Sequence, residues 1–190
     1  ELAKRVRREA DAYLATLEPI PAADLAQLAE LLARGLAAIL RSDVPRDHIA
    51  RTARFVGDAA IPMVALENAV FGLWQARDDC HMASWREGGF DGPTFDVLTH
   101  IWRGAADSED ALATKVPQRP DDVRAAVARL RREGLVDPSR LAVTARGEKA
   151  RQGIEDETDR RFFEPWPDDV GARADWMRER LVAVNTALAP

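Results

Sequence analysis

The sequence predicts a mainly α-helical protein. An N-terminal helical bundle comes first, then three short helices with a β-hairpin, and finally long C-terminal helices. Apolar residues recur at spacings of three and four over most of the 190 residues, as on one face of a helix. Glycines and prolines divide the middle of the chain into short segments. The last segment repeats apolar residues in alternating four- and three-residue steps, which is typical of a helix with a helical partner.

Residues 1–90 are predicted to form the helical bundle, as a region for ligand binding or dimerisation. Amphipathic helices are expected over residues 2–17, 25–40, 49–56 and 63–74. Pro19 and Pro21 end the first helix, and Pro62 should break or kink the chain before the last, because proline has no amide hydrogen to donate. Residues 77–90 show the least regular pattern, and we expect an irregular connection there.

Three short helices are predicted in the middle of the chain. The first follows Pro93, a residue suited to the first helical turn, and stops at a break at Gly104. The second follows the acidic residues 107–110, which favour a helix N-terminus through capping and through the helix dipole. The third begins at Asp121, and Gly134 closes it as the residue just past the helix end.

A short β-hairpin is predicted next, with strands at residues 135–137 and 140–143 joined by a turn at Pro138. This order of elements, in which RLRREGLVD runs into LAVTARGEKA, resembles the winged helix-turn-helix of MarR-type regulators. DDCHMASW, GFDGPTFDVL, VARLRREGLVD, TARGEKARQGIEDETD and PWPDD also follow, in order, the pattern of the actinobacterial SalK-like helix-turn-helix family. The resemblance implies a winged helix-turn-helix domain over residues 91–147, with the hairpin as its wing.

Residues 148–190 are predicted to form a C-terminal region of long helices. The first of these helices begins slightly earlier, at residue 145. The final helix has an apolar seam at Val170, Ala174, Met177, Leu181, Val184 and Leu188. Such a seam needs a helical partner. The N-terminal bundle of the same chain and the same helix of a second copy are both compatible with it, and we expect a homodimer.

Composition excludes several classes of protein. No apolar run approaches the roughly 20 residues of a membrane helix, so we expect a cytoplasmic protein with no membrane partner. Cys80 is the only cysteine, and His48, His81 and His100 have no metal-ligand spacing. We find no phosphate-binding glycine loop and no serine-hydrolase motif. We therefore expect no cofactor, no metal and no catalytic activity, although Asp78 to His81 contain acid, base and nucleophile types.

The first functional hypothesis is a transcriptional regulator that binds double-stranded DNA. The guanidinium groups on the third short helix and the wing could reach phosphates and base edges. The predicted DNA contacts are Arg119, Arg124, Ala125, Ala128, Arg129, Arg132 and Arg140. The net charge of −5 means that any DNA contact must be local. Asp121 and Asp122 lie at the end of the helix that normally enters the groove. The alternative is that carboxylates neutralise these arginines and that the winged helix is a packing or protein-interaction module.

The second hypothesis is a site for a small hydrophobic ligand, which is compatible with the first. Its predicted lining is aromatic with a few polar groups, as in many small-molecule pockets: Phe71, Trp74, Cys80, His81, Trp85, Phe90 and Trp102. Large aromatic residues at helical spacing are also typical of a core, so a purely structural role is the alternative.

Overall fold

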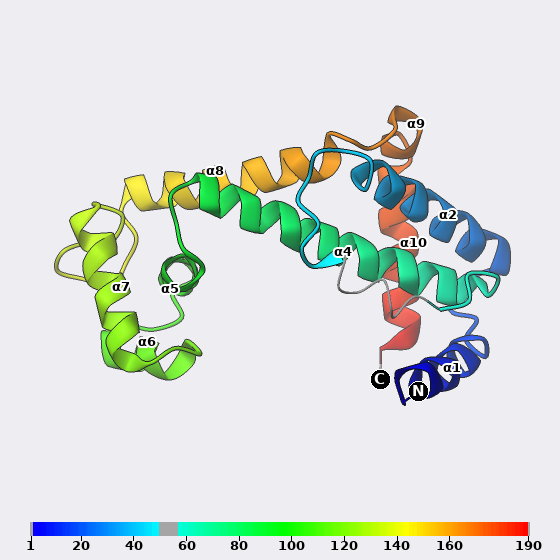
Figure 1. Cartoon of the computed structure of the whole chain (residues 1–190), viewed down its shortest axis with the longest axis horizontal. Coiled ribbons are helices and arrows are strands. Elements are labelled where there is room, and N and C mark those ends of the chain that lie inside the picture. Colours follow the sequence, from blue (N-terminus) through cyan, green and yellow to red (C-terminus); the bar gives the residue numbers. More distant parts are fainter. Residues whose placement is uncertain (1, 50–56, 190) are drawn as a thin grey trace. The chain divides into compact units, whose positions relative to one another are not determined.

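The computed structural model describes residues 2–49 and 57–189 (Figure 1). This part of the chain contains nine helices, which confirms the mainly helical class. They are α1 (Leu2–Leu14), α2 (Ala22–Ile39), α4 (Pro62–Glu87), α5 (Gly92–Trp102), α6 (Glu109–Lys115), α7 (Pro120–Arg132), α8 (Ala145–Phe163), α9 (Asp168–Gly171) and α10 (Ala174–Leu188). None of the described helices combines the length and apolarity that crossing a membrane requires. Most of the helix expected over residues 49–56 lies outside the described residues.

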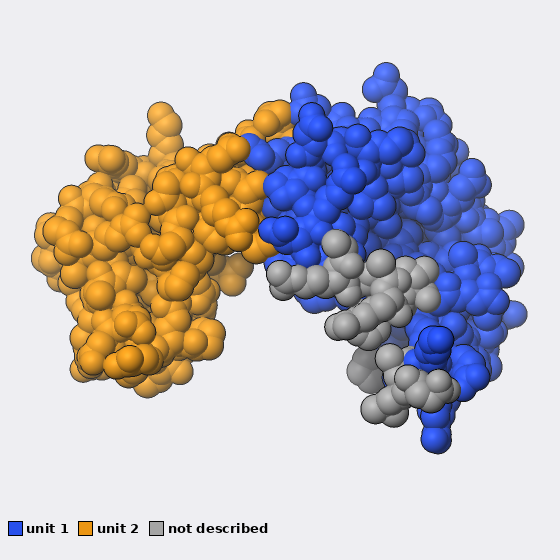
Figure 2. All heavy atoms as spheres, viewed as in Figure 1, with its two compact units in different colours: residues 1–80, 161–190 blue, residues 81–160 orange. Residues whose placement is uncertain are grey.

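Two compact units make up the chain (Figure 2). Unit 1 contains residues 1–80 and 161–190, and unit 2 contains residues 81–160. The core of unit 1 is built from α2, the first part of α4 and the C-terminal helices. The core of unit 2 is built from α5, α6 and α7 together with Ile154 of α8. The predicted functional division at residues 90 and 147 stays a prediction.

Helix α4 corrects the expectation of an irregular connection at residues 77–90. The helix begins at Pro62 and continues to Glu87. Ala76, Cys80 and Ala83 are buried at spacings of four and three, so one face remains covered along the helix. The side chains on this face are small. Small residues contribute little to a hydrophobic pattern, so the sequence did not reveal the helix. The helix ends before Gly89, whose φ of 82° most other residues adopt only at a cost.

The predicted β-hairpin wing is wrong for the described residues, which contain no strand. Val136 and Val143 form a single isolated antiparallel bridge. The side chain of Asp137 accepts hydrogen bonds from the backbone N–H groups of Ser139 and Arg140, at 2.9 and 3.0 Å. This turn takes up most of the residues between the two valines, so too few remain to extend the ladder.

The apolar seam of the last helix packs within its own unit. Met177 and Val184 of α10 are buried in the core of unit 1, and Leu181 packs against that core. Val170 of the short helix α9 is also fully buried there. Of the two partners that the sequence allowed, the structure therefore uses the same chain for most of the seam.

Local signals placed the helices of unit 2 correctly. The side chain of Asp91 caps α5 by accepting a hydrogen bond from the Thr94 N–H at 2.7 Å. Ser108 caps α6 in the same way. Gly104 and Gly134 have φ values of 63° and 71°, which suits glycines that end helices. Because these signals act over three or four residues, the sequence alone was sufficient to locate them.

Candidate nucleic-acid interface

Helix α7 is held by a three-helix core in which α5 and α6 pack against it (Figure 1). Val123, Val127 and Leu130 of α7 are fully buried. They meet Leu98 of α5 and Leu112 of α6, which are equally buried. With one face fixed in this way, the opposite face of α7 is directed to solvent.

The solvent face of α7 combines small residues with charged ones. Asp121, Ala125, Ala128 and Arg132 follow one another at spacings of four, three and four, and all four are exposed. The two alanines leave the middle of this face without bulky side chains. A helix with such a face can approach a flat or grooved partner closely.

Arg124 is exposed but already bonded to carboxylates. It donates to Asp121 and to Asp110 of α6, each at 3.0 Å. The hydrogen bond and charge of Asp110, followed by those of Asp121, raise the pKa of Arg124. The side chain therefore ties α7 to α6, and it would have to exchange a carboxylate for any new anion.

Arg129 fastens α7 to the start of α5. It donates to Glu133 at 2.8 Å, to Asp91 at 2.7 Å and to the carbonyl oxygen of Gly89 at 3.1 Å. The pKa of Asp91 is lowered mainly by the hydrogen bond that its side chain accepts from the Thr94 N–H, and also by the nearby Arg129. All three nitrogens of this guanidinium have partners, so Arg129 stabilises the domain.

Arg131, which the sequence analysis did not select, has a similar role on the other side of α7. It donates to Glu109 at 2.5 Å and to the carbonyl oxygen of Asp137 at 3.2 Å. Its spacing of two residues from Arg129 places the two side chains on opposite flanks of the helix. Sequence could not separate these arginines from exposed ones, because their partners lie far away along the chain.

The remaining predicted contacts are exposed. Arg119 precedes α7 and Arg132 ends it, and no carboxylate of the described residues forms an ion pair with either. Arg140 is 76% exposed, with its guanidinium 3.6 Å from the Asp137 carboxylate. Hydrogen bonds from Ser139 are the main cause that lowers the pKa of Asp137 to about 2. The structure thus divides the predicted arginines into three groups. Arg124 and Arg129 are hydrogen-bonded to carboxylates, and Arg140 forms a looser ion pair. Arg119 and Arg132 pair with no carboxylate of the described residues.

Three of the predicted ligand residues meet around Phe95 of α5. The rings of His81, Trp85 and Phe90 have their centroids 5.3, 6.3 and 5.7 Å from that of Phe95. The Nδ1 atom of His81 is hydrogen-bonded to the hydroxyl of Thr158 at 3.1 Å. These aromatic side chains are therefore mainly packing elements of unit 2.

The other predicted ligand residues do not join this cluster. Phe71 and Trp74 contact each other in unit 1, where Trp74 is 60% exposed. Cys80 is completely buried, and burial raises the pKa of its thiol to about 11. Because reactive cysteines need an accessible thiolate, this thiol is suited to packing and not to nucleophilic attack. Among the described residues, no cluster of three or more potential metal-ligating side chains is present.

Trp102 contributes to a buried cation site that the sequence did not reveal. The guanidinium of Arg151 lies 4.9 Å from the ring centre of Phe95 and 5.1 Å from that of Trp102. Its side chain is only 5% exposed, and it donates to Glu155 at 2.5 Å and to the hydroxyl of Thr99 at 3.2 Å. An arginine in a highly charged helix gives no sequence signal of burial.

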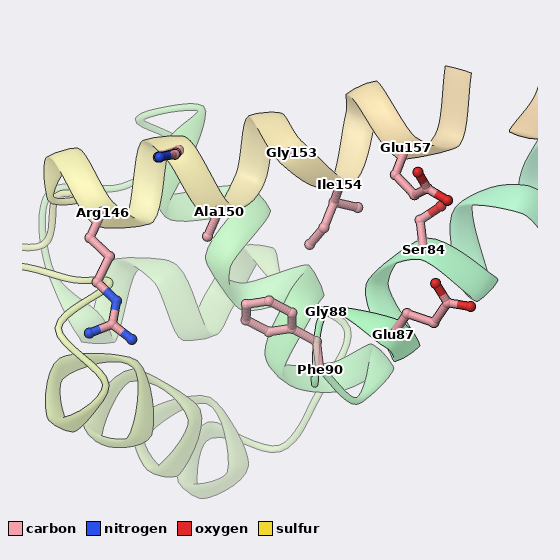
Figure 3. Close-up of a pocket in the computed structure, with 10 residues that line it drawn as sticks. Ser84, Glu87, Gly88, Phe90, Arg146, Ala150, Gly153, Ile154 and Glu157 are labelled. Carbon is pink, nitrogen blue, oxygen red and sulfur yellow. The ribbon is translucent and has the colours of Figure 1, made fainter. Parts of the chain in front are cut away.

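A groove of about 450 Å³ lies in unit 2 (Figure 3). We call it the α4–α8 groove. Its lining comes from the end of α4 and the turn after it, and from α8: Ser84, Glu87, Gly88, Phe90, Arg146, Lys149, Ala150, Gly153, Ile154 and Glu157. Of the seven residues predicted to bind a ligand, only Phe90 lines it. The side chains of Phe90 and Ile154 form the apolar middle of the groove.

Comparison with known proteins agrees with this architecture. A family model described as a helix-turn-helix family matches residues 1–190. No curated protein and no solved structure matches the chain significantly.

Proposed function

Because the chain belongs to a helix-turn-helix family, we propose that it is a DNA-binding transcriptional regulator that inserts α7 into the major groove. The observation that carries this proposal is the solvent face of α7. Ala125 and Ala128 would allow close approach and could contact thymine methyl groups. Arg119 and Arg132, at the two ends of the helix, would contact phosphates or guanine edges.

The paired arginines have a different place in this proposal. Arg129 is left out of the DNA contact because its three nitrogens already bind the protein. Arg124 would reach DNA only by releasing Asp110 or Asp121. Arg140 would contact the DNA backbone from the turn that the structure has in place of the predicted wing. The closer relationship to MarR-type and SalK-like regulators also remains a proposal, supported by the matching segments of sequence.

The first prediction concerns Arg119 and Arg132. Double-stranded DNA selected from a random pool by the wild-type protein should bind the R119A/R132A variant about 10- to 100-fold more weakly. Each phosphate contact removed should also reduce the slope of log affinity against log salt by about one. Fluorescence anisotropy at several salt concentrations measures both effects. Since the two side chains have no partner among the described residues, thermal stability should not change.

The matched control for this experiment is R8A/R41A, which removes two exposed arginines of unit 1. Its DNA affinity should equal that of the wild type. If the wild type enriches no sequence and binds without a salt dependence, the alternative is favoured. In that case the domain is a packing or protein-interaction module, as the carboxylate pairs of Arg124, Arg129 and Arg131 would suggest.

We also propose that the protein acts as a homodimer, since paired helix-turn-helix domains can read two half-sites one DNA turn apart. Large apolar side chains that are 42% to 65% exposed occur in unit 1: Val6, Tyr13, Val70, Trp74, Phe163, Val182 and Leu188. Exposed apolar side chains of this size are candidates for a protein contact.

The second prediction follows from this exposure. Light scattering coupled to size exclusion should give twice the 21.0 kDa of one chain. Trp74→Glu should shift the protein to the monomer, because a charge would have to be buried in the contact. Glu30→Ala, at an exposed position of α2 in the same unit, is the control and should leave the mass unchanged. A wild-type mass of one chain at every concentration would contradict the dimer.

A further inference from the structure

We propose that the α4–α8 groove binds a linear amphipathic carboxylate of the medium-chain fatty acid type. Shape is the first argument. From Arg146 to Glu157 the groove follows three turns of α8, about 16 Å at 1.5 Å per residue. Its volume of about 450 Å³ lies in the range of small-molecule sites. A groove that follows three turns of a helix suits an extended alkyl chain better than a compact ring system.

The lining supplies both parts of an amphipathic site. Phe90, Ala150 and Ile154 form an apolar surface on which an alkyl chain could lie. Arg146 and Lys149 are exposed and line the same groove, and no carboxylate of the described residues pairs with either. The neighbouring acid, Glu148, accepts a hydrogen bond from Trp102 instead. The two cations are therefore available to an external anion.

The position of these cations in the helix is unfavourable without a ligand. Arg146 lies in the first turn of α8 and Lys149 begins the second. The N-terminal end of a helix carries partial positive charge, so basic residues there oppose the helix dipole. A bound carboxylate would remove this conflict. Residues that destabilise the helix in which they lie are expected mainly at functional sites.

The distribution of charge along the groove determines the orientation of the ligand. Figure 3 shows Arg146 at one end and Ser84, Glu87 and Glu157 at the other, with Phe90 and Ile154 between them. Arg146 would donate charge-assisted hydrogen bonds to a carboxylate, whereas the two glutamates at the other end offer it no donor. The acid group of the ligand should thus lie near Arg146, with its chain along Ile154.

The groove also connects the proposed ligand to the proposed DNA contact. An adjoining depression of about 430 Å³ shares Phe90, Arg146 and Ala150 with the groove and reaches Arg132 at the end of α7. A carboxylate bound at Arg146 would attract Arg132 and so compete with DNA phosphates for it. This regulatory step rests on the proposed function, whereas ligand binding itself does not.

The third prediction tests binding without DNA, by calorimetric titration of the full chain with sodium decanoate and with decan-1-ol. The wild type should bind decanoate at least about tenfold more tightly than the alcohol, because only the acid pairs with the cations. In R146Q/K149Q the two affinities should become equal. Gly153→Leu should weaken both ligands, since a Cβ at this position has no neighbour within 4 Å and the added side chain would occupy the groove.

Several outcomes would overturn the site. These are equal wild-type affinities for acid and alcohol, no decanoate binding up to about 1 mM, or undiminished decanoate binding by R146Q/K149Q. R8Q/R41Q, which also removes two exposed positive charges, serves as the charge-matched control and should bind decanoate normally. If Gly153→Leu does not fold by circular dichroism, R146Q/K149Q still decides, because both of its changed side chains are exposed.

DNA binding provides a separate measurement. Saturating decanoate should lower the affinity of the wild type for its selected DNA several-fold, and R146Q/K149Q should lose this response. Decanoate binding with unchanged DNA affinity would keep the site and remove its link to Arg132. If R146Q/K149Q loses DNA affinity and the wild type binds no decanoate, the cations contact the DNA backbone and the ligand proposal fails.

Discussion

Replacement of Gly147 by alanine is expected to lower the free energy of unfolding of unit 2 by roughly 3 kcal/mol. A Cβ atom at this position would lie 2.1 Å from the carbonyl oxygen of Leu135 and 3.0 Å from its carbonyl carbon. Both atoms belong to the backbone, so no side-chain rotation can relieve the contact. The same oxygen accepts a hydrogen bond from the Thr144 N–H at 3.0 Å, which holds it against the first turn of α8.

Thermal unfolding monitored by circular dichroism measures this loss, which corresponds to a decrease in Tm of roughly 12–24 °C for a unit of this size. Gly153→Ala is the matched control, because it makes the same change in the same helix where a Cβ meets nothing within 4 Å. Alanine should stabilise the helix there by about 0.5–1 kcal/mol. Equal Tm values for the two variants would mean that α8 does not approach Leu135 this closely in solution.

Arg151→Ala is expected to destabilise unit 2 by roughly 2–4 kcal/mol. The change removes a guanidinium that is packed between the rings of Phe95 and Trp102 and that donates to Glu155. It also leaves a void inside unit 2, because the side chain that is removed is only 5% exposed. Loss of ring packing, of an ion pair and of filled volume all act in the same direction.

Arg160→Ala provides the comparison for this prediction. Arg160 lies on the same helix and pairs with Glu157 at 2.7 Å, but its side chain is 54% exposed. An exposed ion pair contributes about 0–1 kcal/mol. Urea unfolding of the two variants should therefore differ by at least about 1 kcal/mol. Similar losses would show that the buried position of Arg151 adds nothing to its stabilising effect.

Arg151→Lys separates the contribution of charge from that of shape. Lysine keeps the positive charge but lacks the planar group that stacks on aromatic rings and donates in two directions. We expect this variant to lie between the wild type and Arg151→Ala. A lysine variant as stable as the wild type would attribute the whole effect to charge.

Residues with local effects were predictable from sequence. Ser108 caps α6, Pro62 begins α4, and Gly134 ends α7, as their chemistry requires. The expected β-hairpin failed because the turn at Asp137 uses residues that a ladder would need. The extension of α4 was missed because Ala76, Cys80 and Ala83 give only a weak hydrophobic pattern.

The candidate site was predictable only in part. Sequence identified α7 and its arginines, and Ala125 and Ala128 lie on the exposed face as that prediction requires. It could not show that Arg129 binds Asp91, 38 residues away, while Arg132 has no partner among the described residues. It also did not indicate Arg146 and Lys149, because their importance comes from a groove that α8 forms with the end of α4.

The sequence by itself determined that this protein is helical, where most of its helices begin and end, and which helix presents arginines and alanines together. These properties depend on periodicity and on capping, which act between near neighbours in the chain. Only the tertiary structure decided which arginines are neutralised, which aromatic side chains pack around Phe95, and where a groove remains. Charge pairing, burial and cavities depend on distances between residues that are far apart in sequence, and only folding sets those distances.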